Sequence, residues 1–493
     1  MTTVLMLAAV AVPVLGALAQ LGAGWRRATC WTSVASAVLV LTAAAALAVE
    51  VHRIGPLTAL GGMVRIDALS AFMLIVIGAV GSLSTAAMPG YLRGEITAGR
   101  ATPRSATRHS VLVQLFLAAM VAAVLAANLG VLWVAIEATT IITAFLVGHR
   151  RTRAAVEAAW KYVVICSAGI AVALLGTFLL NYAAAHAPGA AGLELADLAA
   201  HAAEFDPGVT RIAVVLLIIG FGAKAGLAPL HAWLPDAHSQ APAPVSALMS
   251  GVLLSVAFYA ILRIKVIADA ALGTGFTRAL LVGMALASLL VAASLLLAQR
   301  DYKRMLAYSS IEHLALVALG AAIGTPLALA AALLHILGHG LAKGVAFLGA
   351  GRVLQLTGTS RIDEVRGLAT RSPLLAGCLG LGVLALIGLP PFSLFASELG
   401  IARAGFTTSL GWAIAAALLL VLVIAAALIG HTSRMLLGTP PEGPGAATAV
   451  SRVPVSIGIA LVGGLVACAA LGVTAAPLTP LLTDAAQLLG GAR

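Results

Sequence analysis

The chain has 493 residues; 61% of them are hydrophobic, only 10% are charged, and the formal net charge is +11. That balance excludes a soluble globular fold and predicts an all-α polytopic membrane protein, because the apolar runs are about 20 residues long rather than short and alternating. The surplus of basic residues is typical of topology signals at helix ends and not of a nucleic-acid site.

Fourteen transmembrane spans are predicted. In chain order they cover residues 2–21, 31–50, 67–88, 111–127, 130–147, 157–182, 210–235, 241–264, 275–298, 304–322, 325–351, 372–399, 408–430 and 452–475. Glycine and proline break the seventh span near 226–235 and the twelfth near 388–395, and such breaks are tolerated only where other protein or water satisfies the freed backbone. The first run is expected to be a span and not a cleaved signal, because its flanking bases come only after it.

The basic residues divide unevenly between the two sides of the membrane. Eighteen of the 29 Lys and Arg lie in loops after odd-numbered spans, eight lie on the other side, and three lie within spans. The longest loop on the other side, 183–209, has none. The positive-inside rule therefore predicts that both termini lie on the non-cytoplasmic side of the membrane.

The two broken spans lie five spans apart, so they must cross the membrane in opposite directions. This predicts two inverted five-helix repeats, each containing a broken helix. We expect four segments: spans 1–3 with a basic loop (1–110), the first repeat (111–268), the second repeat (269–435) and the last helix (436–493). The proline-rich stretch at 440–445 is expected to be a flexible connection.

Seven ionisable residues fall at membrane depth. They are Glu137, Lys161, Lys224, His335, His339, Lys343 and Glu398. Each costs about 2.5–3.5 kcal/mol to insert on translocon scales, so their repeated presence indicates a functional polar path.

Three of these residues form a column. His335, His339 and Lys343 recur at i, i+4 and i+8, which places them on one helix face. Histidine is suited to passing protons because its charge changes near neutral pH. The alternative is that the histidines only satisfy polar packing against a neighbouring helix.

Lys224 and Glu137 form a second expected pair. A carboxylate close to a buried lysine holds the proton there, and moving the carboxylate away releases it. A static buried salt bridge is the alternative. Lys161 is shallower, and its alternative is to extend to the membrane surface.

Other polar residues lie near the breaks and loops. His231, Asp236 and His238 flank the first break and either take up protons or satisfy the broken backbone. Asp301, Lys303 and Arg304 are expected to form a solvated interfacial cluster. Four further histidines are expected in loops without a constellation around them: His109, His149, His186 and His201.

The four cysteines are isolated and lie in or beside apolar runs: Cys30, Cys166, Cys378 and Cys468. No CxxC or Cys/His ligand spacing occurs, which argues against an iron–sulfur cluster, a zinc site or a disulfide. No glycine-rich phosphate loop follows a strand-like run. We therefore expect neither a cofactor nor a metal in this chain.

Four stretches resemble the antiporter-like membrane subunits of complex I (NADH-quinone oxidoreductase) and the Mrp antiporters. They are KAGLAPLHAWLPDAHSQAPAPVSALMSGVLL, NLGVLWVAIEATT, QRDYKRMLAYSSIEHLALV and HILGHGLAKGVAFLGAG. The segments GLAPLHAWLPDAHSQAPAPVSAL and YSSIEH are most similar to those of hydrogenase-4 component F. The resemblance covers roughly spans 4 to 12.

The resemblance implies a role for several positions. Glu137 matches the family's glutamate of helix 5, Lys224 the lysine of broken helix 7, and Glu398 the charged residue of broken helix 12. Lys343, with His339 beside it, matches the central lysine of helix 11. Some relatives have a further lysine in helix 8, where this chain has Ser255.

The expected function is proton translocation coupled to a redox reaction in other subunits. The expected partners are further membrane subunits and a hydrophilic hydrogenase or dehydrogenase module with iron–sulfur clusters, in the plasma membrane of a prokaryote. A sodium/proton antiporter subunit is the first alternative, which sodium dependence of transport would distinguish. A scaffold that anchors an enzyme and moves no ion is the second.

Overall fold

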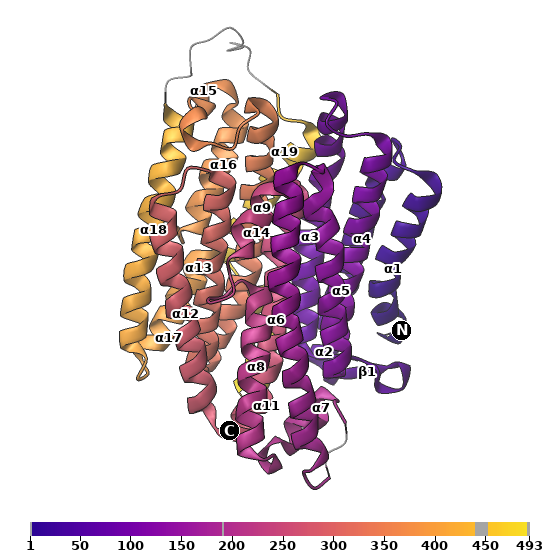
Figure 1. The fold of residues 1–493 in the computed structure, drawn as a ribbon, viewed down its shortest axis with the longest axis vertical. Coiled ribbons are helices and arrows are strands. Elements are labelled where there is room, and N and C mark those ends of the chain that lie inside the picture. The colour runs from indigo at the N-terminus through magenta and orange to yellow at the C-terminus, as the bar shows by residue number, and fades with distance from the viewer. Residues whose placement is uncertain (1, 190–191, 439–451, 491–493) are drawn as a thin grey trace.

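The computed structural model describes residues 2–189, 192–438 and 452–490, which form a bundle of helices crossing in both directions (Figure 1). In the first half of the chain the elements are α1 (Thr2–Ala23), α2 (Thr32–Ile54), β1 (Leu57–Ala59), β2 (Val64–Ile66), α3 (Ala68–Thr97), α4 (Pro103–Leu125), α5 (Leu129–Val147), α6 (Arg153–Ala185), α7 (Leu195–His201), α8 (Pro207–Ala225), α9 (Trp233–Gln240), α10 (Ala243–Leu248), the π-helical turn η5 (Met249–Leu253) and α11 (Leu254–Leu272). In the second half they are α12 (Thr274–Leu297), α13 (Tyr302–Ile323), α14 (Pro326–Thr357), α15 (Leu368–Arg371), α16 (Pro373–Leu386), α17 (Ser393–Phe406), α18 (Gly411–Leu437), α19 (Val455–Val473) and α20 (Thr479–Gly490). β1 and β2 form a small antiparallel hairpin.

Thirteen helical spans in the described chain are long and apolar enough to cross a membrane, with α10 to α11 counted as one. The pair α16 and α17, too short individually, supplies a fourteenth crossing. The predicted count and the all-α membrane fold are therefore confirmed. In Figure 1 the broken helix α8–α9 runs upward and α16–α17 runs downward, as expected for inverted repeats.

At the first break, between α8 and α9, protein groups form hydrogen bonds with the backbone that the interruption leaves open. Gly226 ends α8 with φ +79°, a left-handed conformation that favours glycine. The backbone N–H of Ala228 donates to the Ser288 hydroxyl (2.8 Å), and the indole N–H of Trp233 donates to the Ala223 carbonyl (2.9 Å). Neighbouring helices thus replace the hydrogen bonds that the interruption removes, which a break at membrane depth requires.

The second break brings a carboxylate against the backbone. Gly388 has φ +68°, and a Cβ there would overlap the carboxylate of Glu398. The backbone N–H of Leu389 donates to the Leu384 carbonyl at 3.2 Å and so closes the end of α16. Glycine is therefore needed here both for the turn and for the close approach of Glu398.

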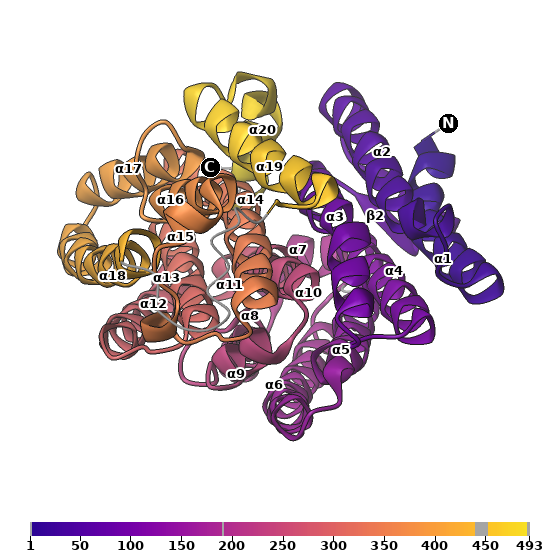
Figure 2. The same ribbon diagram turned by 90° about the horizontal axis from the view of Figure 1, so that it is seen from above.

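The centre of the bundle is formed by α10–α11, α13 and α14, which are buried throughout their apolar length. By contrast, α1, α18 and α19 expose most of their length, and Figure 2 shows them at the periphery. Small residues permit the central contact: a Cβ on Gly251 of η5 would lie 3.0 Å from the Gly340 Cα of α14. Close backbone approach through small residues is the usual packing of membrane helices.

A buried ion pair joins α3 to α11 near the lower end of Figure 1. Arg263 donates to both carboxylate oxygens of Asp67 at 2.7 Å and to the Ser70 hydroxyl at 2.8 Å. Burial by itself raises the pKa of Asp67, but the Arg263 guanidinium, the Ser70 backbone N–H and Arg65 together outweigh it and hold that pKa below its ordinary value. This bidentate pair fixes two spans that are distant in sequence.

Several helices extend beyond the predicted spans, and one helix is not predicted at all. For example, α3 ends at Thr97 rather than near 88. α4 begins at Pro103 rather than near 111, because Thr102 and Ser105 form a capping box and proline occupies the first turn. The helix α20 is not among the predicted elements; it packs against α3 and α14, and Asp484 on it lies 2.7 Å from the His52 ring nitrogen. The proline-rich connection at 440–445 lies outside the described residues.

Candidate polar path through the membrane

Lys224, in the last turn of α8, is completely buried among polar partners. Its ammonium donates to the Tyr162 hydroxyl at 2.5 Å and to the Thr140 hydroxyl at 2.7 Å. The ammonium also lies 4.8 Å from the centroid of the Tyr162 ring. Three helices, α5, α6 and α8, thus supply the surroundings of this lysine.

Glu137 reaches Lys224 through a threonine and not directly. The Thr140 hydroxyl donates to Glu137 at 3.0 Å, and the Ser167 hydroxyl donates to its other carboxylate oxygen at 3.2 Å. No ion pair joins Lys224 and Glu137 in the described residues, so the expected pair is bridged by one hydroxyl. We call Glu137, Thr140, Tyr162 and Lys224 the Lys224 cluster.

Glu137 itself is only half-buried and lies toward the outer face of α5. Val134 and Ile141, one turn away on either side, are 59% and 57% exposed. A carboxylate at this depth and position faces lipid or a neighbouring membrane subunit. Because lipid cannot solvate it, a protein neighbour is the physically reasonable environment.

Lys343, in the middle of α14, is also completely buried. Its ammonium donates to the Leu306 carbonyl at 2.6 Å and to the Ser309 hydroxyl, both on α13. His339 lies one turn earlier on the same face of α14, as the spacing predicts.

The histidine column of α14 is completed by a histidine of α13. The Nε2 atom of His335 lies 3.1 Å from Nδ1 of His313, and its Nδ1 lies 2.9 Å from the Ser397 hydroxyl on α17. The His313 ring is 4.9 Å from the His339 ring, centroid to centroid. His313 therefore joins the two histidines of the predicted column, and all three are buried.

Glu398 ends this group at the outer side of α17. Its carboxylate and the ring nitrogens of His313 and His335 all lie within 4.8 Å of one another. Glu398 is half-buried, and Leu399 beside it is 56% exposed. We call His313, His335, His339, Lys343 and Glu398 the Lys343 cluster.

The three ligand atoms at Glu398, His313 and His335 are also close enough to share a metal ion, the one such set in the described chain. The absence of a metal stays a prediction. Proton transfer needs the same atoms, since imidazole and carboxylate groups within a few ångströms exchange protons directly or through one water.

Three members of the two clusters are not predicted from the sequence: His313, Thr140 and Tyr162. Glu312 and His313 are buried ionisable residues inside the apolar α13, yet sequence reasoning notes them only within the YSSIEH motif. Charge-bearing residues inside an apolar run are the signal that identifies them. Thr140 and Tyr162 give no such signal, because neither is charged.

The helix α9 begins with Trp233, whose ring lies 4.9 Å from the Tyr162 ring, centroid to centroid. The same helix carries His238, which the sequence places beside the first break. It is buried on α9, its ring stacks on Phe347 of α14 at 5.1 Å, and both ring nitrogens lack a partner in the described part of the protein. On η5 and α13, the hydroxyls of Ser250 and Ser310 lie 2.8 Å apart. No direct hydrogen bond between described residues joins the Lys224 cluster to the Lys343 cluster.

Lys161 lies apart from these buried groups. It is exposed on α6, and its ammonium pairs with Glu157 at 2.7 Å and Asp236 at 3.1 Å. Asp236 also binds Arg304 at 2.9 Å, so the three helices α6, α9 and α13 meet in a surface ion-pair cluster. The assignment of Lys161 to the path stays a prediction.

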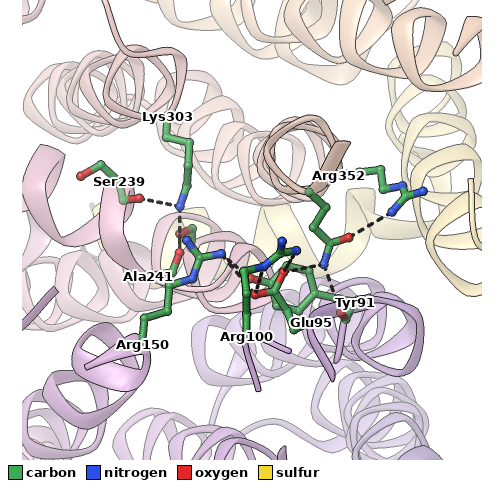
Figure 3. Close-up of polar contacts among 10 residues, drawn as sticks. Tyr91, Glu95, Arg100, Arg150, Ser239, Ala241, Lys303 and Arg352 are labelled. Carbon is green, nitrogen blue, oxygen red and sulfur yellow. Dashed lines mark hydrogen bonds and ion pairs between the residues drawn. The ribbon is translucent and has the colours of Figure 1, made fainter. Parts of the chain in front are cut away.

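The expected solvated cluster at the start of α13 is only partly solvated. Lys303 is buried and donates to the carbonyls of Ser239 (2.7 Å) and Ala241 (2.8 Å), as Figure 3 shows. Asp301 accepts hydrogen bonds from the backbone N–H of Lys303 and Arg304 and so caps α13. Lys303 therefore satisfies the open carbonyls after α9, which explains its burial. His231, at the first break, is half-buried.

The residues of the candidate path lie within a segment that matches a known protein family. Residues 126–424 match the family model described as NADH:quinone oxidoreductase/Mrp antiporter, TM. The chain is 39% identical over 354 residues to a hydrogenase-4 component F homolog of Methylacidiphilum infernorum, and the match covers 71% of this chain and 74% of that protein.

Solved structures show the same fold over the whole chain. A subunit of the membrane-bound sulfane sulfur reductase, an archaeal respiratory membrane complex, superposes with a TM-score of 0.86 and 25% identity over 99% of this chain and 97% of that one. A subunit of respiratory complex I from Thermus thermophilus gives 0.78 and 26% over all of both chains.

Proposed function

The chain belongs to the NADH:quinone oxidoreductase/Mrp antiporter transmembrane family, and on that premise we propose that it is the proton-translocating subunit of a membrane-bound hydrogenase or complex I-like oxidoreductase. Its partners are further membrane subunits and a hydrophilic redox module carrying iron–sulfur clusters. The protein is a multi-pass membrane protein, and we place it in the plasma membrane of a prokaryote with both termini outside the cytoplasm.

One observation carries this proposal: two buried lysines and three buried histidines lie inside spans that are otherwise apolar. Removing each such group from water has a large cost, which a scaffold has no reason to bear. The two carboxylates Glu137 and Glu398 end this set at α5 and α17, which lie on opposite sides of the bundle in Figures 1 and 2. The arrangement is that of a lateral path with a carboxylate at each end.

Unpartnered buried atoms support water between the two clusters. Nε2 of His339, Nε2 of His313 and both ring nitrogens of His238 have no partner among the described residues. Buried polar atoms of this kind are usually satisfied by ordered water. We propose that water joins Lys224 to Lys343 through the region of His238, where Ser255 stands in place of a lysine found in some relatives.

The Lys224 cluster supplies the coupling element. The ammonium donates to Thr140, which donates to Glu137, so a charge that arrives at or leaves Glu137 is transmitted through one hydroxyl. Because Glu137 lies at the outer face, a neighbouring subunit can bring a charged group close to it or move that group away. Such a change alters where the proton is most stable without a large movement of helices.

Redox-driven proton flux in inverted vesicles tests the proposal. Replacing Glu137 by Gln removes the charge and keeps the size, and it should reduce flux at least tenfold while electron transfer by the complex continues. The matched control is Glu204→Gln, an exposed carboxylate that follows α7, which should leave flux unchanged. Equal flux in both variants and the wild type contradicts the proposal, and flux that requires sodium supports the antiporter alternative.

A further inference from the structure

A basic pocket lies at the end of the bundle shown at the top of Figure 1, where α3 ends and α4 begins. It encloses about 500 Å³ and is also lined by the junction of α5 and α6. Five arginines line it: Arg100, Arg104, Arg108, Arg150 and Arg151. Glu95 is the one acidic residue among the lining residues, so the pocket carries a large excess of positive charge.

The Glu95 carboxylate already accepts hydrogen bonds from residues of the protein. Glu95 accepts two hydrogen bonds from Arg100 (2.9 and 3.2 Å) and one from Gln355 (3.0 Å), and Arg150 lies 3.7 Å away. Figure 3 shows Arg100 and Arg150 converging on this carboxylate and on Tyr91. Glu95 therefore neutralises at most part of the charge of two arginines.

The other three arginines are free to bind a ligand. The guanidinium groups of Arg104, Arg108 and Arg151 make no hydrogen bond or ion pair with any described residue, and all three side chains are exposed at the rim. Arg104 and Arg108 lie one turn apart on α4, so their guanidinium groups face the same opening.

Two histidines line the inner part of the pocket without partners. His109 is completely buried, and neither of its ring nitrogens has a partner in the described chain. Nδ1 of His149 is likewise unpartnered, and the two rings meet edge to face at 5.0 Å. The sequence places both histidines in loops without a constellation, but α4 and the end of α5 bring them together. Buried polar atoms without partners point to a ligand or water in this pocket.

We infer that this pocket binds a phosphate group, carried either by the headgroup of an anionic phospholipid or by a soluble phosphate. Planar guanidinium groups match phosphate oxygens with two parallel hydrogen bonds, and histidine N–H groups at the base add donors. A volume of this size accommodates a headgroup. The pocket opens at the end of the membrane spans, where lipid phosphates lie and basic pockets between helices bind them.

The test uses the full-length chain with whatever subunits co-purify, in nanodiscs of phosphatidylcholine with or without phosphatidylglycerol. Native mass spectrometry counts the lipids that remain bound. The double variant Arg104→Gln/Arg108→Gln should retain phosphatidylglycerol about thirtyfold less than the wild type, since each of the two arginines contributes about 1 kcal/mol at an anionic surface and about 1.4 kcal/mol corresponds to a factor of ten. Arg26→Gln/Arg27→Gln is the control, because it removes the same charge from exposed positions in the α1–α2 connection outside the pocket.

A second arm separates the two sources of phosphate. Inorganic phosphate added to the lipid-depleted protein should raise the melting temperature of the wild type and of the control, but not of Arg104→Gln/Arg108→Gln. Retention of phosphatidylglycerol assigns the site to lipid, and a phosphate effect without lipid retention assigns it to a soluble phosphate. Equal behaviour of both double variants, equal retention of the two lipids without a phosphate effect, or a bound acidic peptide in place of lipid overturns the inference.

Discussion

The Nδ1 atom of His313 lies 3.1 Å from the Nε2 atom of His335, so one histidine of α13 connects directly to one of α14. This contact joins two helices that form the fully buried centre of the bundle. On the proposed path, this contact lets protons move sideways from the α14 column through His313 as well as from turn to turn.

Replacing His313 should therefore interrupt the path. His313→Gln keeps a polar side chain but removes the ring that accepts and donates protons, and we expect at least a tenfold loss of redox-driven proton flux. The control is His186→Gln, because His186 is exposed and its ring contacts Tyr182 of the same helix end, with Nδ1 2.8 Å from the Tyr182 carbonyl oxygen. Equal flux in the two variants would show that His313 has a structural role and does not transfer protons.

The bridging hydroxyl of Thr140 can be tested almost isosterically. Thr140→Val keeps the shape and removes the hydrogen bonds to Lys224 and Glu137. Thr140→Ser keeps the hydroxyl. We expect flux to fall severalfold in the valine variant and to stay near the wild-type rate in the serine variant. Equal loss in both would attribute the effect to packing of the threonine methyl group.

The sequence and the structure lead to different predictions for Lys161. If it belongs to the path, Lys161→Ala abolishes flux as Lys224→Ala does. Its exposed position and its ion pairs with Glu157 and Asp236 instead predict flux within twofold of the wild type. The flux assay applied to both alanine variants decides between these outcomes.

The Asp67–Arg263 pair predicts a stability effect without a direct effect on the path. Asp67→Ala leaves a buried guanidinium without its counter-ion and should cost about 3–5 kcal/mol. The exposed Asp363→Ala is the control. A melting temperature measured in detergent that is the same for both variants would contradict the importance of this pair.

The same pair gives a pH dependence. Because the pKa of Asp67 is lower in the folded protein than in the unfolded chain, its stabilising contribution is fully present above the ordinary aspartate pKa. The contribution is lost as the pH falls through the folded value. Melting curves recorded from neutral to acidic pH should therefore show a larger loss in the wild type than in Asp67→Asn, in which other carboxylates such as Glu95 still titrate.

The spans and both breaks are predictable from the sequence because each depends on local composition. A run of about 20 apolar residues must cross the bilayer, and glycine with proline must interrupt a helix. The predicted start of α4 is wrong because residues 103–110 are polar, although Thr102, Pro103 and Ser105 carry a recognisable helix-start pattern. The short α20 escapes prediction because its pattern is amphipathic and shorter than a span.

The site is less predictable because it depends on how the helices are rotated against one another. The spacing of His335, His339 and Lys343 places them on one face of α14, but no local pattern says that His313 of α13 meets that face. Nor does the sequence of α6 say which side faces outward. The exposed Trp160 and Val164 show that Lys161 lies on the outer side.

The central claim is that protons cross through the buried lysines of this chain, and proton uptake by vesicles that contain the intact complex tests it most directly. Lys224→Ala and Lys343→Ala should each abolish redox-driven acidification while substrate oxidation and complex assembly persist. Full acidification in either variant, with the complex intact, would contradict the account.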